Sequence, residues 1–185
     1  MKKIALFLAE GFEEIEAVTP MDLLRRAGID LITAGVTGPM ITGGHGITIR
    51  ADRELKELTG SADSFDGVIV PGGVGGAENI AASVPAVEFI KNMMNAGKLV
   101  AAICAAPALV LTPLGIIDGK QATCYPGFEE KFTGAKFAAQ RVVADGNVIT
   151  SRGPGTAAEF SIAIIAYLEG EEKAEQIRSR TLQKV

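Results

Sequence analysis

The residue of this sequence best suited to covalent chemistry is Cys104. It follows the apolar run Leu99–Ile103, which predicts a buried strand, and small residues suited to a helix come directly after it. A thiol between the end of a strand and the start of a helix lies near unpaired backbone N–H groups and the positive end of the helix dipole, and both favour the thiolate. The pattern is that of a nucleophile elbow with cysteine in place of serine. The alternative is a core cysteine, because free cysteine is among the most buried residue types.

Four glutamates stand within residues 10–16 and are the candidate acids and bases. Glu13 and Glu14 fit the first turn of a helix, where carboxylates complement the helix dipole. Glu16 lies one turn into this helix beside the apolar Ile15 and Val18, which predicts that its side chain faces inward. A buried carboxyl has a raised pKa, and in its protonated form it can donate a hydrogen bond to a thiolate.

The elements that must position these residues begin with a βαβ unit. Residues 3–9 are typical of a strand buried on both faces, and apolar residues recur at helical spacing over residues 14–27. Pro20 predicts that this helix kinks or starts late, and Gly28 ends it before a second strand over residues 29–34. Such a unit implies a parallel sheet with a right-handed crossover.

The rest of the chain continues to alternate between strand and helix patterns, which predicts a doubly wound α/β sandwich with an antiparallel annex. The expected elements are strands over 65–70 and 99–103, helices over 85–96, 156–168 and 171–180, and hairpins within 37–49 and 138–150. Ligands bind beyond the carboxyl ends of the strands in such sheets. Glu10, Gly72, Gly73 and Cys104 all follow predicted strands, so we expect them on one rim.

Composition and charge narrow the possible functions. The 185 residues are 48% hydrophobic and 22% charged, an ordinary globular balance. A net charge of −4, the absence of Trp and a 5% aromatic content argue against specific nucleic-acid binding. The longest apolar run, Leu99–Leu111, is too short to span a bilayer, and no signal peptide is expected. With one histidine and no CxxC motif, we expect a cytoplasmic protein without metal or other cofactor.

Four segments, in order and spacing, resemble the DJ-one/ThiJ/PfpI superfamily, in the branch of the parkinsonism-associated protein and its bacterial relatives. They are AEGFEEIEA with DLLRRAG at residues 9–17 and 22–28, VPGG at 70–73, AAICAAP at 101–107 and TSRGPGT at 150–156. The resemblance implies a flavodoxin-like, class I glutamine amidotransferase-like fold. This is a three-layer sandwich with a mainly parallel central sheet and an antiparallel annex, in a single domain over residues 1–185.

The resemblance also implies a site. It assigns the nucleophile to Cys104 and its carboxyl partner to Glu16. Backbone N–H groups around Gly72, Gly73 and Ala105 would form an oxyanion-type pocket. The activities ascribed to the superfamily are cofactor-free glyoxalase, protein or nucleotide deglycase, redox sensing and chaperone work of the holding type.

One departure from the superfamily pattern bears on catalysis. Several members place a histidine where this sequence has Tyr125, before Pro126. A phenol has a pKa of about 10 and is a poor base at pH 7, so a Cys-His dyad is absent at this point and peptidase activity loses its main support. Tyr125 is retained as a pocket residue.

The resemblance implies a homodimer, for which the sequence offers two kinds of support. The helix over residues 14–27 carries Met21, Leu23 and Leu24, which are more than one buried stripe requires. In this branch, Arg26 and a basic residue near His45 can form a small anion pocket at the dimer face.

Four further residues are expected to be mainly structural. Cys124 is interpreted as a core or pocket-lining thiol, with a resolving thiol for oxidised Cys104 as the alternative. Arg152 is expected to order the loop before the last long helix, Thr156 to cap that helix and Glu159 to complete its capping box.

The preferred function is a cofactor-independent glyoxalase or deglycase that acts on reactive aldehydes or on glycated proteins or nucleotides, in carbonyl and oxidative stress defence. Cys104 would attack the aldehyde while Glu16 moves protons. The alternative is a redox sensor and holding chaperone that uses oxidation of the same cysteine. A cysteine peptidase or amidase is the weakest candidate, because it lacks a histidine base.

Overall fold

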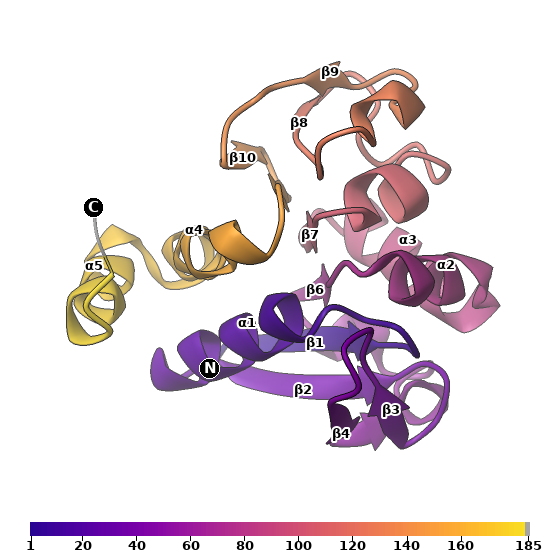
Figure 1. Cartoon of the computed structure of the whole chain (residues 1–185). Helices are drawn as coiled ribbons and strands as arrows, with labels where there is room; N and C mark the ends of the chain where they lie inside the picture. The colour runs from indigo at the N-terminus through magenta and orange to yellow at the C-terminus, as the bar shows by residue number, and fades with distance from the viewer. Residues whose placement is uncertain (184–185) are drawn as a thin grey trace.

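The computed structural model describes residues 1–183 and is built around a seven-stranded sheet (Figure 1). The strand order is β10-β11-β7-β6-β1-β2-β5, and every neighbouring pair is parallel except β10 with β11. The strands are β1 (Lys3–Leu8), β2 (Asp30–Gly35), β5 (Arg53–Glu54), β6 (Gly67–Val70), β7 (Leu99–Ile103), β10 (Val142–Asp145) and β11 (Val148–Ser151). The predicted parallel sheet with an antiparallel annex is confirmed.

Helices cover both faces of this sheet. Ile4, Leu6 and Leu8 of β1 pack in one core with α1 (Glu14–Arg26), α4 (Ala157–Glu169) and α5 (Glu171–Arg180). Ala5 and Phe7 point the other way, into a core that includes α2 (Val74–Ala82), α3 (Val84–Asn95) and the helical turn η3 (Pro107–Leu111). Figure 1 shows α4 and α5 on the opposite side of β6 and β7 from α2 and α3. Because successive strand residues face opposite sides, a strand that is apolar throughout supplies two cores at once.

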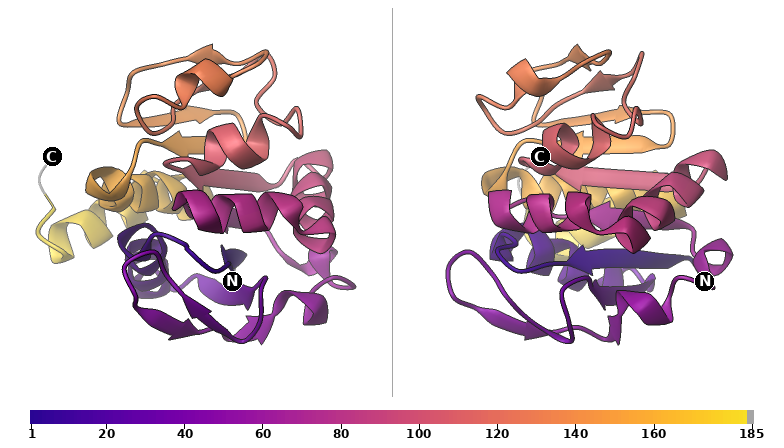
Figure 2. Two further views of the ribbon diagram at one scale, coloured as in Figure 1. Left: turned by 45° about the vertical axis from the view of Figure 1, so that its right-hand side comes forward. Right: turned by 90° about the vertical axis from the view of Figure 1, so that its right-hand side faces the viewer.

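Smaller elements extend the two ends of the sheet. The glycine-rich segment forms the predicted hairpin, in which β3 (Met40–Thr42) pairs antiparallel with β4 (Thr48–Arg50). At the other end, β8 (Gln121–Ala122) and β9 (Lys136–Phe137) form a parallel pair (Figure 2). Four short 3-10 turns lie at Leu55–Glu57, Ala62–Ser64, Glu129–Lys131 and Pro154–Thr156. No helix among the described residues is long and apolar enough to cross a membrane.

The helix α1 begins at Glu14 and runs through Pro20, so the expected late start is wrong. Pro20 removes one backbone donor from the helix. Two features support the helix on either side of it. The Glu13 carboxylate accepts a hydrogen bond from the Glu16 N–H at 2.7 Å, and Leu23 and Leu24 pack in the core. Capping and burial therefore outweigh the lost hydrogen bond.

Candidate active site

The candidate site is centred on Cys104, which follows β7 directly. Its backbone has a φ of 65°, in the left-handed region that residues other than glycine seldom adopt. Hydrogen bonds on both sides hold this conformation: the Cys104 N–H donates to the Ser151 carbonyl at 2.9 Å, and the Tyr125 N–H donates to the Cys104 carbonyl at 2.8 Å. Strained backbone persists where its surroundings over-determine it. Here the strain places the thiol at the rim of the sheet, where it is 9% exposed.

The Glu16 carboxyl reaches the thiol from α1. The side chain is fully buried and lies against Cys104. Its Oε2 accepts a hydrogen bond from the Gly72 N–H at 2.9 Å. Its Oε1 has no hydrogen-bond partner among the described residues. One carboxyl oxygen is thus fixed by the backbone, and the other is left for a proton.

Burial shifts the pKa values of both groups upward. Burial raises the pKa of Glu16 to about 7, and Glu13 adds a smaller upward shift. Burial and then the negative charge of Glu16 raise the pKa of the Cys104 thiol to about 12, while the N–H groups of Gly73 and Ala105 oppose this shift. The charge of Glu16 disappears when that carboxyl is protonated. The single proton that the pair keeps above pH 7 can lie on either group, and a thiolate forms beside a neutral Glu16 when the proton moves from the sulfur to the carboxyl.

The three expected backbone donors do not all face the sulfur. The N–H groups of Gly73 and Ala105 point at the Cys104 sulfur, but that of Gly72 is directed to Glu16. Glycine is required at position 72 because a Cβ there would clash with the Glu16 carboxylate and lie 2.5 Å from the Cβ of Cys104. Gly72 therefore positions the acid, and two donors remain for an oxyanion.

A cavity of about 590 Å³ opens above the thiol. Tyr125 lines it, is 45% exposed and packs edge-on against Phe128, with ring centroids 6.5 Å apart. The other lining residues are Glu13, Glu14, Ile15, His45, Ile47, Gly73, Val74, Cys104, Ala105 and Pro154. Sequence reasoning missed Ile47, Val74, Phe128 and Pro154, because a single sequence gives no signal for which apolar side chains face a cavity.

His45 and Glu14 join the β3–β4 hairpin to α1 at the edge of this cavity. The Glu14 carboxylate accepts hydrogen bonds from the His45 N–H at 2.7 Å and the Ile47 N–H at 3.4 Å, and it pairs with the His45 Nδ1 at 2.8 Å. These contacts with Glu14 raise the pKa of His45. Glu13 also offers an oxygen, and all three ligand atoms lie within 4.8 Å of one another. Because the carboxylate of Glu14 already accepts hydrogen bonds from the hairpin, we assign the cluster to fixing this wall.

The structure does not bring Arg26 to this cavity. Arg26 is exposed near the C-terminal end of α1 and pairs with Asp22 at 2.6 Å. Within one chain, Arg26 and His45 therefore form no common anion pocket.

Cys124 is fully buried, does not line the cavity and has a pKa raised to about 12 by burial and then by Glu129.

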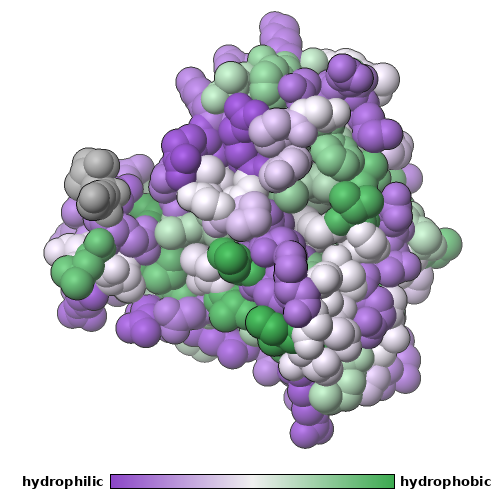
Figure 3. Space-filling model, viewed as in Figure 1, coloured by the Kyte–Doolittle hydropathy of each residue, from purple (hydrophilic) through white to green (hydrophobic). Residues whose placement is uncertain are grey.

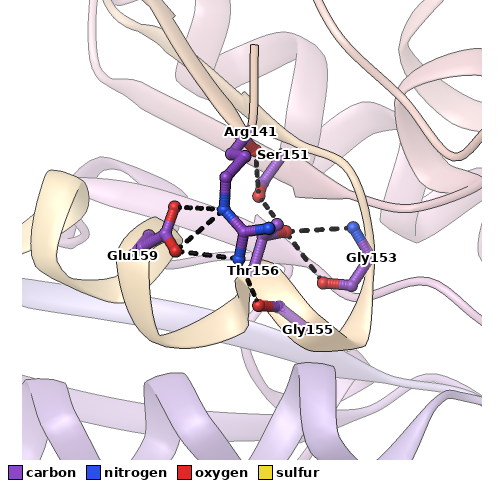
Figure 4. Close-up of polar contacts among 6 residues, drawn as sticks. All are labelled: Arg141, Ser151, Gly153, Gly155, Thr156 and Glu159. Atoms are coloured by element: carbon purple, nitrogen blue, oxygen red, sulfur yellow. Dashed lines mark hydrogen bonds and ion pairs between the residues drawn. The ribbon is translucent and has the colours of Figure 1, made fainter. Parts of the chain in front are cut away.

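The loop between β11 and α4 contributes Pro154 to the wall of the cavity. Figure 4 shows the hydrogen bonds that hold this loop. The Thr156 hydroxyl lies 2.6 Å from that of Ser151 and 2.8 Å from the Gly153 carbonyl, and it accepts the Gly153 N–H at 3.1 Å. A Cβ on Gly153 would lie 3.1 Å from the Tyr125 ring. The loop is therefore held tightly against the wall of the cavity.

The expected cap of α4 is wrong. The Thr156 side chain makes no capping hydrogen bond to the helix, because it is bonded within the loop. Glu159 pairs with Arg141 at 2.8 Å instead of completing a capping box, and Arg141 also donates to the Gly155 carbonyl at 2.6 Å. Arg141 thus orders this loop, whereas Arg152 lies over the Phe137 ring.

This chain is similar to known proteins over most of its length. The model of the DJ-1/PfpI family matches residues 2–167. Protein DJ-1 homolog B of Arabidopsis thaliana is 39% identical over 181 residues, which is 97% of this chain but 41% of that protein. The chain thus spans less than half the length of this relative. The Parkinson disease protein 7 homolog of Danio rerio is 38% identical over 99% of this chain and 98% of its own length.

Two further proteins are similar along almost their whole length. The glutathione-independent glyoxalase DJR-1.2 of Caenorhabditis elegans is 36% identical over 95% of this chain and 94% of its own. The solved structure of oxidized Toxoplasma gondii DJ-1 covers 100% of both chains with a TM-score of 0.96 and 33% identity. Since the family model and these relatives extend along nearly the whole sequence, the chain belongs to the DJ-1/PfpI family.

Proposed function

We propose that this protein is a cofactor-independent glyoxalase that converts 2-oxoaldehydes to 2-hydroxy acids. One observation carries the proposal: the buried Glu16 carboxyl lies against the Cys104 thiol, and the N–H groups of Gly73 and Ala105 point at the same sulfur. The pair supplies a nucleophile and a group that exchanges protons, and the N–H groups supply oxyanion donors. The glyoxalase among the relatives supports the same activity.

The reaction runs through a thioester. The Cys104 thiolate bonds to the aldehyde carbon, and the resulting oxyanion takes the proton of Glu16. The Glu16 carboxylate then removes the hydrogen from that carbon, and an enediol forms as the hydroxyl proton of the first carbon passes to the oxygen of the neighbouring carbon. Glu16 returns the hydrogen to the neighbouring carbon. The first carbon is oxidised to a thioester and the second is reduced to an alcohol. Water cleaves the thioester, releases the 2-hydroxy acid and restores the thiol, so the net reaction adds one water.

The test is lactate formation from methylglyoxal in buffer free of metal and glutathione. Wild type should form lactate, and Cys104→Ala should form none above background. Cys124→Ala is the matched control, because this second thiol lies outside the cavity, and it should keep wild-type activity. Lactate formation by folded Cys104→Ala at the wild-type rate would refute the proposal.

The same cysteine chemistry extends to deglycation, in which a glycated protein or nucleotide forms the adduct and its amine leaves. None of the described residues that line the cavity is Lys or Arg, so nothing there favours the phosphates of a nucleotide. We therefore favour glycated thiols and amines of proteins as the second substrate class.

A redox sensor with holding-chaperone activity is the second candidate. Two equivalents of peroxide would oxidise the Cys104 thiol to a sulfinate, and the N–H groups of Gly73 and Ala105 would hold its oxygens. A gain of two oxygen atoms at Cys104 under mild peroxide, together with suppressed aggregation of a client protein, would favour this candidate over the enzyme. A peptidase or amidase is less well supported, because Tyr125 lines the cavity where several superfamily members have the histidine base.

We further propose a homodimer formed through α1 and the β3–β4 hairpin. Leu23 and Leu24 are buried in the core, so they cannot contribute to the interface as expected. Other apolar side chains are exposed instead. Figure 3, which has the view of Figure 1, shows apolar areas on the surface near α1. We define the α1–hairpin patch as Ile15, Val18, Met40 and Ile47, which are each 44% to 56% exposed. Ile15 and Ile47 also line the cavity, so this patch borders the candidate site. Such patches mark interaction surfaces.

The proposal also covers the number of domains and the cellular location of the protein. We propose that residues 1–185 act as one domain, because both hydrophobic cores pack on the same sheet. We propose a cytoplasmic location, because both cysteines are free and the chemistry requires a reduced thiol. Labelling of both thiols after denaturation, in protein extracted without reductant, tests the second statement.

A further inference from the structure

We propose that the cavity above Cys104 selects 2-oxoaldehydes with a bulky apolar substituent, aryl or branched alkyl, over methylglyoxal. This inference rests on the proposed glyoxalase activity and names its substrate class. Three features of the cavity carry it: its size, the side chains of its wall and the partners of its charged groups.

The cavity is too large for the smallest substrates. Its volume of about 590 Å³ falls in the range of sites that take drug-sized ligands, roughly 300–1,000 Å³. Methylglyoxal has five non-hydrogen atoms, so it would leave most of this space to water. A phenyl ring in place of the methyl group would fill far more of the space and remove apolar surface from water on both partners.

The wall that such a substituent would meet is apolar. Tyr125 and Phe128 form an edge-to-face pair, and Val74 and Pro154 add aliphatic surface. Edge-to-face contacts between aromatic rings are favourable beyond the area they bury. An aryl group can therefore contact both an aromatic and an aliphatic surface in this cavity.

The charged groups of the lining are already engaged with the protein. Glu14 binds the hairpin loop and His45, and Glu13 accepts the Glu16 N–H at 2.7 Å. None of the described lining residues is Lys or Arg. A neutral substituent costs these groups none of their contacts, whereas an anionic one would face two carboxylates and only His45, already paired with Glu14, as a possible cation.

The reaction geometry directs the substituent to this wall. The aldehyde carbon must reach the Cys104 sulfur, and its oxygen must reach the N–H groups of Gly73 and Ala105. The second carbon carries the substituent, which is left to occupy the rest of the cavity. The wall formed by Tyr125, Phe128, Val74 and Pro154 is therefore a specificity surface for the substituent.

The experiment compares phenylglyoxal with methylglyoxal by the mandelate and lactate they yield. The measured quantity is the ratio of their kcat/KM values, in wild type and in Phe128→Ala. Comparing ratios between variants cancels the different intrinsic reactivity of the two aldehydes. Phe137→Ala is the matched control, because Phe137 is exposed but does not line the cavity. Val74→Ala is a second variant at an exposed site where a folding defect is not expected.

We expect the ratio to favour phenylglyoxal in wild type by about tenfold or more, since each methylene in an apolar pocket is worth about tenfold at least. The ratio should fall at least about fivefold in Phe128→Ala, fall less in Val74→Ala and stay within about twofold in Phe137→Ala. The inference is overturned if wild type converts methylglyoxal as well as phenylglyoxal, or if folded Phe128→Ala and Val74→Ala keep the wild-type ratio. In those cases the glyoxalase itself stands. If wild type converts neither aldehyde, the proposed function fails and the inference fails with it.

Discussion

Cys104 and Glu16 titrate as a pair, because the two buried groups lie against one another. The first proton leaves the pair near pH 7. Above that pH, the fraction of pairs with a thiolate beside a neutral carboxyl no longer depends on pH. The rate at which iodoacetamide labels Cys104 should therefore rise through about pH 7 and then level off towards pH 9. Mass spectrometry of protein labelled between pH 4 and 9 measures it.

Cys124 is the internal control for this labelling, because it is fully buried and should react slowly at every pH. Equal labelling of Cys124 near pH 6 would show that Cys104 is not the reactive thiol. A labelling rate that keeps rising tenfold per pH unit to pH 9 would show that Cys104 titrates independently of Glu16.

The buried Glu16 makes stability depend on pH. Its pKa is raised from 4.5 to about 7, so between these values the folded protein keeps a proton that the unfolded chain has lost. Stability from this group is therefore present at low pH and is lost as pH rises through that window. From pH 4 to 8, the free energy of unfolding should fall by about 3 kcal/mol more in wild type than in Glu16→Gln. Urea titrations at each pH measure this difference, and parallel profiles would contradict it.

Replacing Tyr125 by histidine should raise turnover of methylglyoxal. The rim already holds a thiol, a carboxyl and two backbone donors, and a histidine would add a second base at the position where several superfamily members have one. A well-aligned base contributes about 10²–10⁴-fold, and an unoptimised graft should give about tenfold. Lactate production by Tyr125→His is compared with wild type at pH 7.5. No gain in a folded variant with an unchanged labelling rate would show that a base at this position does not limit catalysis.

Glu16 faces inward as the sequence predicts, but it does not share a buried face with its apolar neighbours on the helix. Its apolar neighbours Ile15 and Val18 were expected to share the buried face, yet both are exposed. The helix buries Ala17, Leu23 and Leu24, and Glu16 turns towards the loop at Gly72. Helical phase is uncertain near a helix start, because a few residues do not define a stripe. The motif identified the carboxyl better than the hydrophobic pattern did.

The loop between β11 and α4 depends on one hydroxyl group. Thr156→Val keeps the shape of the side chain but removes its bonds to Ser151 and to the backbone of Gly153. The Gly153 N–H then loses its acceptor, whereas Ser151 keeps its bond to the Arg141 carbonyl and the Gly153 carbonyl keeps the Thr156 N–H. Leaving one buried donor unpaired should cost about 1–3 kcal/mol of stability, and Thr156→Ser should cost less because it keeps the hydroxyl. Thermal or urea unfolding of both variants measures the difference. Equal losses in the two variants would contradict this role of the hydroxyl, because Thr156→Ser keeps it and Thr156→Val does not.

Strands and long helices were predictable, and the elements governed by contacts distant in sequence were not. The apolar runs of β1, β6 and β7 were identified, whereas α2 was missed because Gly75 and Gly76 are poor helix formers. Gly76 is needed there, since a Cβ would lie 2.7 Å from the Cα of Phe12. The two-residue strands β8 and β9 have too short a pattern to detect. The prediction of a capping box at α4 was wrong because Glu159 pairs with Arg141, which is distant in sequence.

The whole molecule should be a homodimer in solution. The α1–hairpin patch leaves four apolar side chains exposed on one chain, and a permanent interface buries more than about 2,000 Å². Light scattering at micromolar concentration should give twice the 19.2 kDa of one chain. Val18→Lys places a charge in the patch and should give a monomer, whereas Val84→Lys, at an exposed valine of α3 outside the patch, should not. A wild-type monomer would exclude this interface.

The position of Ser151 has a consequence for synthesis of the chain. The carbonyl that holds the backbone of Cys104 belongs to β11, which begins 45 residues after the end of β7 and is therefore synthesised later. Until β11 docks, residue 104 is an ordinary cysteine on a flexible chain, without the left-handed backbone that aims its sulfur. The thiol therefore becomes positioned to attack aldehydes only after β11, the last strand of the sheet in the sequence, has docked. In a ribosome-stalled fragment that ends before residue 148, iodoacetamide should label Cys104 no faster than it labels free cysteine.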